Sequence, residues 1–138
     1  VAFVIYLIIS LFAAPPVMLK QSGKEMGMAL RELNTENTVI CAEGFYRTSA
    51  VFYSEKTIYS AVPGKGIDKL KPGGLSWNAK NVMPFIALEE VEKMPNIVVI
   101  TQETDDNRKE DDFQKKLAGR KDISRINVND EYTFWVSQ

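Results

Sequence analysis

The chain has 138 residues, of which 45% are hydrophobic and 25% charged, and its formal net charge is −1. Such a balanced charge gives no global field that would attract nucleic acid. Histidine is absent and Cys41 is the single cysteine, which excludes histidine-dependent nucleophilic systems, His-ligated zinc and an internal disulfide within this chain. We therefore expect no catalytic constellation, no metal site and no resident cofactor here.

The segment Val1–Ala14, VAFVIYLIISLFAA, contains no charged residue and is stopped by Pro15 and Pro16. A helix that spans a bilayer needs about 20 apolar residues, but this limit does not apply to a run that is cut off by the start of the given sequence. We expect residues 1–16 to be the end of a transmembrane helix, and residues 17–138 to form a soluble extracytoplasmic domain. A signal peptide, with Ala13-Ala14 as its cleavage site, and a buried segment of a soluble domain remain alternatives.

The first element after the two prolines is a predicted helix at about Gly23–Leu33. Ser22 and Glu25 have the spacing of a capping box, and apolar residues follow at helical intervals. The segment Thr38–Phe45 begins with TVICA, and its β-branched, apolar character predicts a central parallel strand buried on both faces. Cys41 lies within it and is expected to be a small core residue.

A compact strand–helix–strand unit is predicted next. Thr48 or Ser49 is expected to cap a short helix that runs to Ser54, and the segment Thr57–Val62 reads as the second strand. The segment Pro63–Lys80 contains several glycines and a charge of +3, so we expect an irregular loop that could face anionic lipid headgroups. Its sequence Pro-Gly-Lys-Gly lacks the spacing of a phosphate-binding loop.

The second half of the chain continues the alternation of helices and strands. A helix is predicted at about Phe85–Lys93, and Asn96–Gln102, NIVVITQ, is the clearest buried strand, expected in the middle of the sheet. The acidic segment Glu103–Asp112 lacks the residue order of an EF-hand and reads as a solvated loop. A helix anchored by Phe113 and Leu117 follows.

Two strands, Ile123–Val128 and Tyr132–Val136, are separated by a polar turn and predict a terminal hairpin. The whole pattern predicts an α/β fold. Specifically, we expect a Rossmann-like layered sandwich with a mostly parallel sheet and a C-terminal antiparallel hairpin, preceded by the end of a transmembrane helix.

Candidate ligand-binding residues follow from this fold, because open α/β sheets bind ligands beyond the carboxyl ends of their strands. The residues after the first strand, above all Glu43, Tyr46 and Arg47, and with them Gly44 and Phe45, are therefore candidates. So are Thr101, Gln102 and Glu103 after the NIVVITQ strand, and Trp77 in the glycine-rich loop. As an alternative, the aromatic residues simply cover the edge of the sheet, and Trp77 anchors its loop to the core.

The sequence resembles the C-terminal part of bacterial GT-C membrane glycosyltransferases, the polyprenyl-phosphate-dependent enzymes of the aminoarabinose transferase and protein mannosyltransferase type. The resemblance rests on the segment Tyr46–Lys56, whose Ser49-Ala50-Val51-Phe52-Tyr53 matches a small-apolar-Phe-Tyr core before a strand. A strand like Asn96–Gln102 and an aromatic terminal strand like Tyr132–Val136 also fit. The glycine-rich segment Pro63–Lys80 does not map onto the family's pattern.

This resemblance implies a non-catalytic domain of an enzyme that transfers a sugar from a polyprenyl-phosphate carrier to a lipid or protein acceptor. The family's catalytic acidic residues lie between early transmembrane helices, so none is carried over to this chain. The implied partners are membrane lipids and, through the missing membrane part, the polyprenyl-phosphate donor; the implied location is the extracytoplasmic face of the cell membrane. The alternatives are a membrane-anchored binding or sensor module without an enzyme, and a free-standing soluble α/β enzyme.

Overall fold

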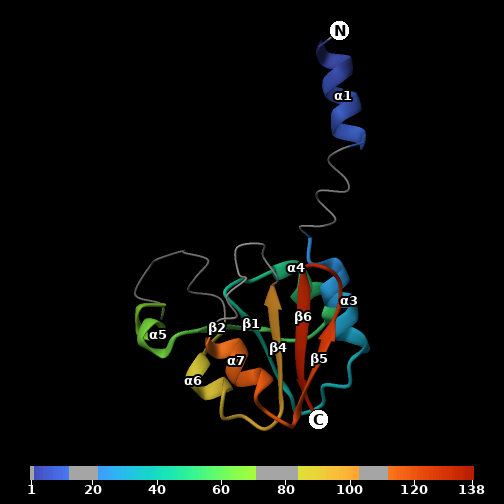
Figure 1. Cartoon of the computed structure of the whole chain (residues 1–138). Helices are drawn as coiled ribbons and strands as arrows, with labels where there is room; N and C mark the ends of the chain where they lie inside the picture. Colours follow the sequence, from blue (N-terminus) through green and yellow to red (C-terminus); the bar gives the residue numbers. More distant parts are fainter. Residues whose placement is uncertain (1, 13–21, 71–83, 103–111) are drawn as a thin grey trace. The chain divides into compact units, whose positions relative to one another are not determined.

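The computed structural model of the protein describes residues 2–12, 22–70, 84–102 and 112–138 (Figure 1). Their contacts define two compact units. The first, which we call the helical unit, comprises Val1–Leu33 and Arg47–Lys56. The second, the sheet unit, comprises Asn34–Tyr46 and Thr57–Gln138.

The helical unit contains the described helices α1 (Ala2–Phe12), α3 (Lys24–Glu32) and α4 (Thr48–Ser54). Helices α3 and α4 approach each other at Gly27, where an added Cβ would lie 2.8 Å from the Tyr53 Cβ and 2.9 Å from the Ala50 carbonyl oxygen. Only glycine allows this close approach. On the buried side of α3, Met26 and Leu30 are 1% and 0% exposed, as the helical spacing predicts.

The start of α3 differs from the predicted capping box. Its N-cap is Gly23, which has a left-handed φ of 63° that glycine adopts without strain. Ser22 lies one residue earlier, and its hydroxyl oxygen accepts a hydrogen bond from the backbone N–H of Lys24 at 3.3 Å. Ser22 therefore still satisfies a free N–H at the helix start, but not in the predicted position.

Helix α4 also begins differently from the prediction, because Arg47 is its N-cap and no side chain caps it. The hydroxyl of Ser49 instead donates to the backbone carbonyl of Ser22, which joins α4 to the start of α3. At the other end, the Lys56 Nζ donates to the carbonyl oxygens of Leu30 and Leu33, at 2.7 Å each. The carbonyls at the end of a helix lack the usual partners further along the chain. The Leu30 carbonyl also accepts from the backbone N–H of Leu33 at 3.3 Å, so Lys56 adds a second donor to it and supplies one to Leu33.

The sheet unit is built on a six-stranded sheet of order β3-β2-β1-β4-β6-β5. Neighbouring pairs among β3, β2, β1 and β4 are parallel, and β6 pairs antiparallel with both β4 and β5. The structure thus confirms a mixed α/β fold with a mostly parallel sheet and a C-terminal antiparallel hairpin. The strands are β1 (Val39–Glu43), β2 (Tyr59–Val62), β3 (Phe85–Ala87), β4 (Ile97–Gln102), β5 (Ile123–Asn127) and β6 (Tyr132–Ser137).

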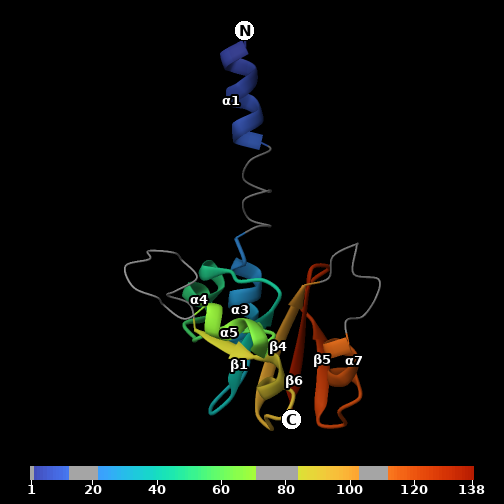
Figure 2. The ribbon, with the colours of Figure 1, turned by 90° about the vertical axis from the view of Figure 1, so that its left-hand side faces the viewer.

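The middle position predicted for the NIVVITQ segment is confirmed. Strand β4 pairs with β1 on one side and β6 on the other, and Figure 2 shows β4, β6 and β5 side by side. In the register of these strands, Val99 lies between Cys41 of β1 and Trp135 of β6. The four residues Ile97–Ile100 are at most 1% exposed, so both faces of the strand are buried.

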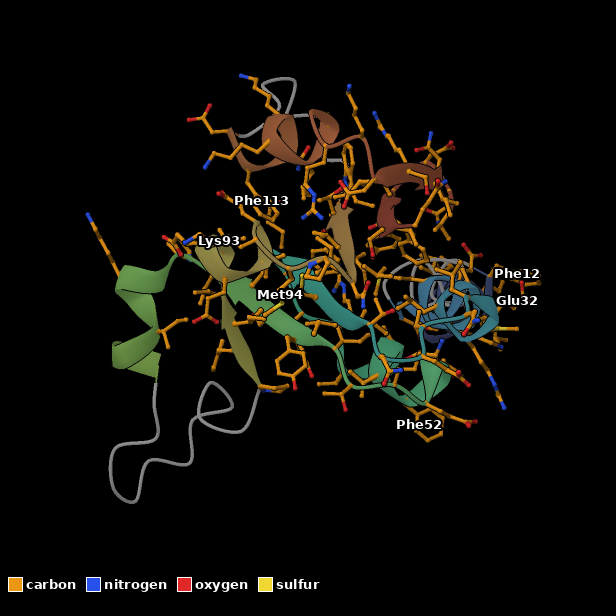
Figure 3. All side chains as sticks on the ribbon, turned by 90° about the horizontal axis from the view of Figure 1, so that it is seen from below. Phe12, Glu32, Phe52, Lys93, Met94 and Phe113 are labelled. Atoms are coloured by element: carbon orange, nitrogen blue, oxygen red, sulfur yellow. The ribbon has the colours of Figure 1, made fainter. Side chains whose placement is uncertain are left out.

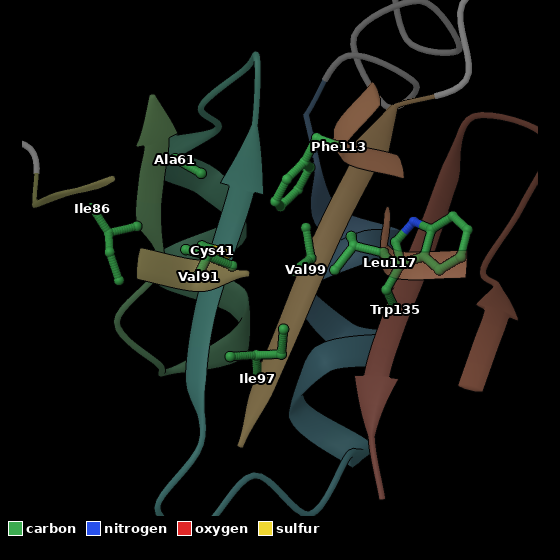
Figure 4. Close-up of a cluster of buried hydrophobic side chains, with 9 residues drawn as sticks. All are labelled: Cys41, Ala61, Ile86, Val91, Ile97, Val99, Phe113, Leu117 and Trp135. Carbon is green, nitrogen blue, oxygen red and sulfur yellow. The ribbon is translucent and has the colours of Figure 1, made fainter. Parts of the chain in front are cut away.

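A hydrophobic cluster covers one face of this sheet (Figure 4). Helix α6 (Leu88–Val91) contributes Val91, and α7 (Asp112–Ala118) contributes Phe113 and Leu117. These side chains pack with residues that alternate along the strands and share one face of the pleat. The strand residues of the cluster are Cys41, Ala61, Ile86, Ile97, Val99 and Trp135.

Two predicted elements are wrong. The segment Phe85–Lys93 is not one helix, because its first residues form β3, in which Ile86 pairs with Ala61 of β2; the spacing of apolar residues mimics a helix, and the tertiary pairing overrides it. The segment Pro63–Lys80 is not irregular throughout, since α5 runs over Gly64–Leu70. The rest of that segment lies outside the described residues.

Candidate functional site

The carboxyl edge of the sheet has a point at which the strand order reverses. The chain passes from β1 to β2 and β3 on one side, and then returns to place β4 on the other side of β1. In open α/β sheets, ligands bind at such a reversal, beyond the carboxyl ends of the two strands that flank it. The predicted candidates Glu43 and Gln102 are the last residues of these two strands, β1 and β4.

Glu43 contacts a residue that the sequence analysis missed. The Gln114 side-chain amide, on α7, donates to the Glu43 carboxylate at 3.4 Å, and both side chains are half-buried. Gln114 adjoins the core residue Phe113 in the sequence, so its helical position could be predicted. Its proximity to β1 could not, because that depends on which face of the sheet α7 covers.

Gln102 forms a second pair of the same kind. Its side-chain amide donates to the Glu131 carboxylate at 2.9 Å. Glu131 lies directly before β6, and the antiparallel register places Tyr132 opposite Gln102. Glu131 was also missed, because the hairpin was predicted without its pairing to β4.

The neighbouring candidate Thr101 is part of the buried core. It is 3% exposed, and its hydroxyl oxygen accepts a hydrogen bond from the Trp135 indole N–H at 3.1 Å. A buried indole N–H needs such an acceptor. We therefore assign Thr101 a structural role.

The segment after β1 combines an open backbone position with two aromatic residues. Gly44 has a φ of +73°, and a Cβ built on it would meet nothing within 4 Å. The Phe45 ring contacts the Tyr132 ring, with centroids 5.7 Å apart, which agrees with the alternative that Phe45 covers the edge. Tyr46 is half-buried, and burial raises the pKa of its hydroxyl, so this group stays protonated near neutral pH.

Arg47 belongs to the helical unit, whereas Glu43 and Tyr46 belong to the sheet unit. Its Cβ would lie 3.2 Å from a Cβ added to Gly23, so its aliphatic part packs against the start of α3. Its buried Nε finds no acceptor among the residues that the structure describes. The remaining candidates, Trp77 and Glu103, lie outside the described residues.

Three other kinds of site were considered among the described residues: a metal site, a reactive thiol and a phosphate site. No group of three or more potential metal ligands occurs there. Burial raises the pKa of the Cys41 thiol to about 12, so it is a poor nucleophile at neutral pH. At the start of α5, the Gly64 N–H donates to the Glu89 carboxylate at 3.0 Å, so a carboxylate already occupies the position that a phosphate would need.

Helix α1 exposes apolar side chains along its length. Val4, Ile5, Ile8, Ile9 and Leu11 are 50–62% exposed, and Phe12 is 77% exposed. Its 11 residues carry no charge. Among the described residues, no helix has both the length and the apolar character needed to cross a membrane.

Comparison of the chain with protein-family models, curated proteins and solved structures gives no significant match.

Proposed function

We propose that this chain is a membrane-tethered, non-catalytic α/β domain, and specifically the C-terminal extracytoplasmic domain of a polyprenyl-phosphate-dependent membrane glycosyltransferase. The membrane tether is supported by the uncharged helix α1, in which the described apolar side chains Val4, Ile5, Ile8, Ile9, Leu11 and Phe12 are exposed. A surface of this kind in water drives association or insertion into lipid.

The dimensions of α1 fit the end of a spanning helix. With a rise of about 1.5 Å per residue, its 11 residues extend about 16 Å. That is about half of the hydrocarbon thickness of a bilayer, which is about 30 Å. In this proposal, the other half of the span precedes Val1 in a longer protein, and the domain lies on the extracytoplasmic face.

The glycosyltransferase part of the proposal is supported by the resemblance of Tyr46–Lys56 and of the aromatic terminal strand to that family. The Rossmann-like layering predicted from the sequence belongs to the same proposal. Catalysis would come from acidic residues in the missing membrane part, and the chain alone should transfer no sugar. Detection of transfer from a polyprenyl-phosphate sugar by this chain alone would contradict the non-catalytic role.

The decisive experiment is the hydropathy of the complete open reading frame, combined with flotation of the full chain on phospholipid vesicles. A membrane glycosyltransferase predicts about ten or more apolar spans upstream, and the tether predicts that the chain floats with the vesicles. A chain that stays with the soluble fraction would remove the tether from the proposal.

A membrane-anchored binding or sensor module is the second candidate. It is favoured by the half-buried polar residues at the carboxyl edge of the sheet, notably Glu43, Gln102, Gln114 and Glu131. An open reading frame with only one or two apolar spans would favour this module over the glycosyltransferase.

A further inference from the structure

We infer that the folded part of the helical unit has a lipid-contacting surface of its own, formed by Lys24, Met28, Phe52 and Tyr53. This surface, which we call the outer surface of the helical unit, lies in the headgroup region of the membrane that anchors α1. The inference rests on the tether of the proposed function, because four side chains bury too little apolar area to hold a chain at a membrane alone.

Few large apolar side chains outside α1 are exposed among the described residues. They are Phe52, which is 75% exposed, Met28, which is 50% exposed, and Ile126, which is 40% exposed. Phe52 and Met28 belong to the helical unit, which also contains α1. Figure 3 shows the Phe52 ring projecting outward from α4. Single exposed apolar residues are ordinary in proteins, so the inference depends on whether Phe52 and Met28 share a surface.

The contacts between α3 and α4 place these residues on one surface. The Phe52 and Tyr53 rings meet edge to face, with centroids 5.3 Å apart, and the Lys24 ammonium lies 5.7 Å from the Tyr53 centroid. Met28 follows Lys24 by about one helical turn and lies on the same face of α3. With 3.6 residues per turn, Lys24, Met28 and Phe52 lie opposite to the buried residues of their own helices. Those buried residues are Met26, Leu30, Ala50 and Ser54.

The chemistry of the outer surface fits the boundary between lipid and water. Phe52 and Met28 offer apolar surface to the acyl chains. The half-buried Tyr53 combines an apolar ring with a polar hydroxyl, a combination that is enriched at the headgroup level of membranes. Lys24 has an apolar stem and an ammonium group, which can reach the phosphate of a lipid headgroup.

The connection to α1 favours lipid over another protein as the partner. Residues 13–23 join the end of α1 to Lys24, and even a fully extended chain of this length spans at most about 40 Å. A membrane that anchors α1 therefore stays within reach of α3. Such a linkage raises the effective concentration of lipid at the outer surface, so that a weak contact is populated. A free protein partner has no such advantage.

The test is a nuclear magnetic resonance measurement on the ¹⁵N-labelled full chain in nanodiscs of phosphatidylcholine and phosphatidylglycerol. A lipid that carries gadolinium on its headgroup broadens the resonances of amides that lie close to the membrane surface. We expect the amides of Met28, Phe52 and Tyr53 to lose more intensity than any described amide of the sheet unit.

Substitutions then separate contact from mere proximity. Met28→Gln/Phe52→Gln removes two apolar side chains at exposed helical positions that glutamine suits, so the fold should be retained and the broadening at positions 52 and 53 should be lost. The matched control is Ile126→Gln, which removes the exposed apolar residue of the sheet unit and should leave the broadening unchanged. Thermal melting followed by circular dichroism shows whether each variant is folded.

Two results would overturn the inference while the chain still floats with phospholipid vesicles. In the first, the amides of the outer surface are broadened no more than those of the sheet unit. In the second, the double glutamine variant keeps the broadening of the unsubstituted chain. Both leave the tether of the proposed function in place, because flotation depends on α1. Loss of flotation by the unsubstituted chain would instead remove the tether, and the lipid contact with it.

Discussion

Helix α1 and strand β4 are both apolar runs, yet their side chains have opposite surroundings. Val4 of α1 is 58% exposed, whereas Val99 of β4 is 0% exposed. Strand β4 has β1 and β6 as neighbours and contributes Ile97 and Val99 to a packed cluster. Apolar composition alone therefore does not predict whether a segment is buried in the protein core or leaves its side chains exposed on the protein surface.

The largest expected effect is that of Val99→Asp. The carboxylate would be buried without a partner among Cys41, Trp135 and Leu117, which costs several kcal/mol or shifts its pKa strongly upward. We expect this variant not to fold, as measured by circular dichroism and thermal melting of the full chain in detergent.

The matched control is Val4→Asp, the same substitution in α1. Because Val4 is exposed, the melting temperature should remain that of the unsubstituted chain. Equal melting of the two variants would contradict the difference in burial between the two segments.

The next largest effect is expected in α1, which we propose to be inserted in a lipid bilayer. In Ile5→Lys/Ile9→Lys, two charges enter the half of the hydrocarbon that α1 would cross; a lysine costs about 2.5–3.5 kcal/mol at the centre of a membrane helix and less toward its end. Flotation on vesicles should be lost, while the melting temperature is retained. Ile126→Lys, at a 40% exposed apolar residue on β5, serves as the control and should float normally. Flotation of the double lysine variant would show that α1 is not the tether.

The reactivity of the Cys41 thiol reports how well the sheet shields this side chain from solvent. The thiolate is the reactive form, and burial raises the Cys41 pKa from 9.0 to about 12. We expect Cys41 to react with a thiol reagent at pH 8 about a thousandfold or more slowly than in urea-unfolded protein. A cysteine introduced at the exposed Lys121 provides the rapid control. Rapid labelling of native Cys41 would mean that β1 is not a central strand.

The same pKa shift has a defined pH dependence. Below about pH 9 the thiol is protonated in both the folded and the unfolded chain, so its contribution to stability is fully present. Between pH 9 and about 12 only the unfolded chain ionises, and the free energy of unfolding falls. Cys41→Ala should remove this part of the alkaline decline, which urea titrations at several pH values would detect.

Some elements could be predicted from the sequence, because their own residues have the pattern typical of that element. Strand β4 is apolar at every position from Ile97 to Ile100, so its central place could be predicted from composition and length. The pair of strands β5 and β6 could be recognised from its polar turn and alternating residues. Glu43 and Gln102 could be placed at a shared edge, because both follow strands that were predicted to be parallel.

The rest depended on contacts between distant residues. Strand β3 has only three residues, and its place is fixed by pairing with β2, so the helical spacing of Phe85 and Leu88 was misleading. The Glu43–Gln114 contact joins residues 71 positions apart, and no local pattern encodes it. The N-cap of α3 is Gly23 and not the predicted Ser22, because the backbone at the N-cap has a φ of 63°, which suits glycine.

The smallest effect is expected at a polar surface that neither core nor lipid covers. Glu55 ends α4 with a left-handed φ of 57°, a conformation that strains residues with a Cβ and suits glycine. Its carboxylate lies 3.0 Å from the Arg31 guanidinium, but the two side chains are 66% and 61% exposed, so this ion pair contributes little. Glu55→Gly should therefore raise the free energy of unfolding by about 0.5 kcal/mol, after allowing for the greater entropy of the unfolded chain. Met28→Gly, at a 50% exposed residue in the interior of α3, is the control and should lower it by about 1 kcal/mol. If urea unfolding shows that Glu55→Gly also destabilises the protein, the Arg31–Glu55 pair outweighs the backbone strain at the end of α4.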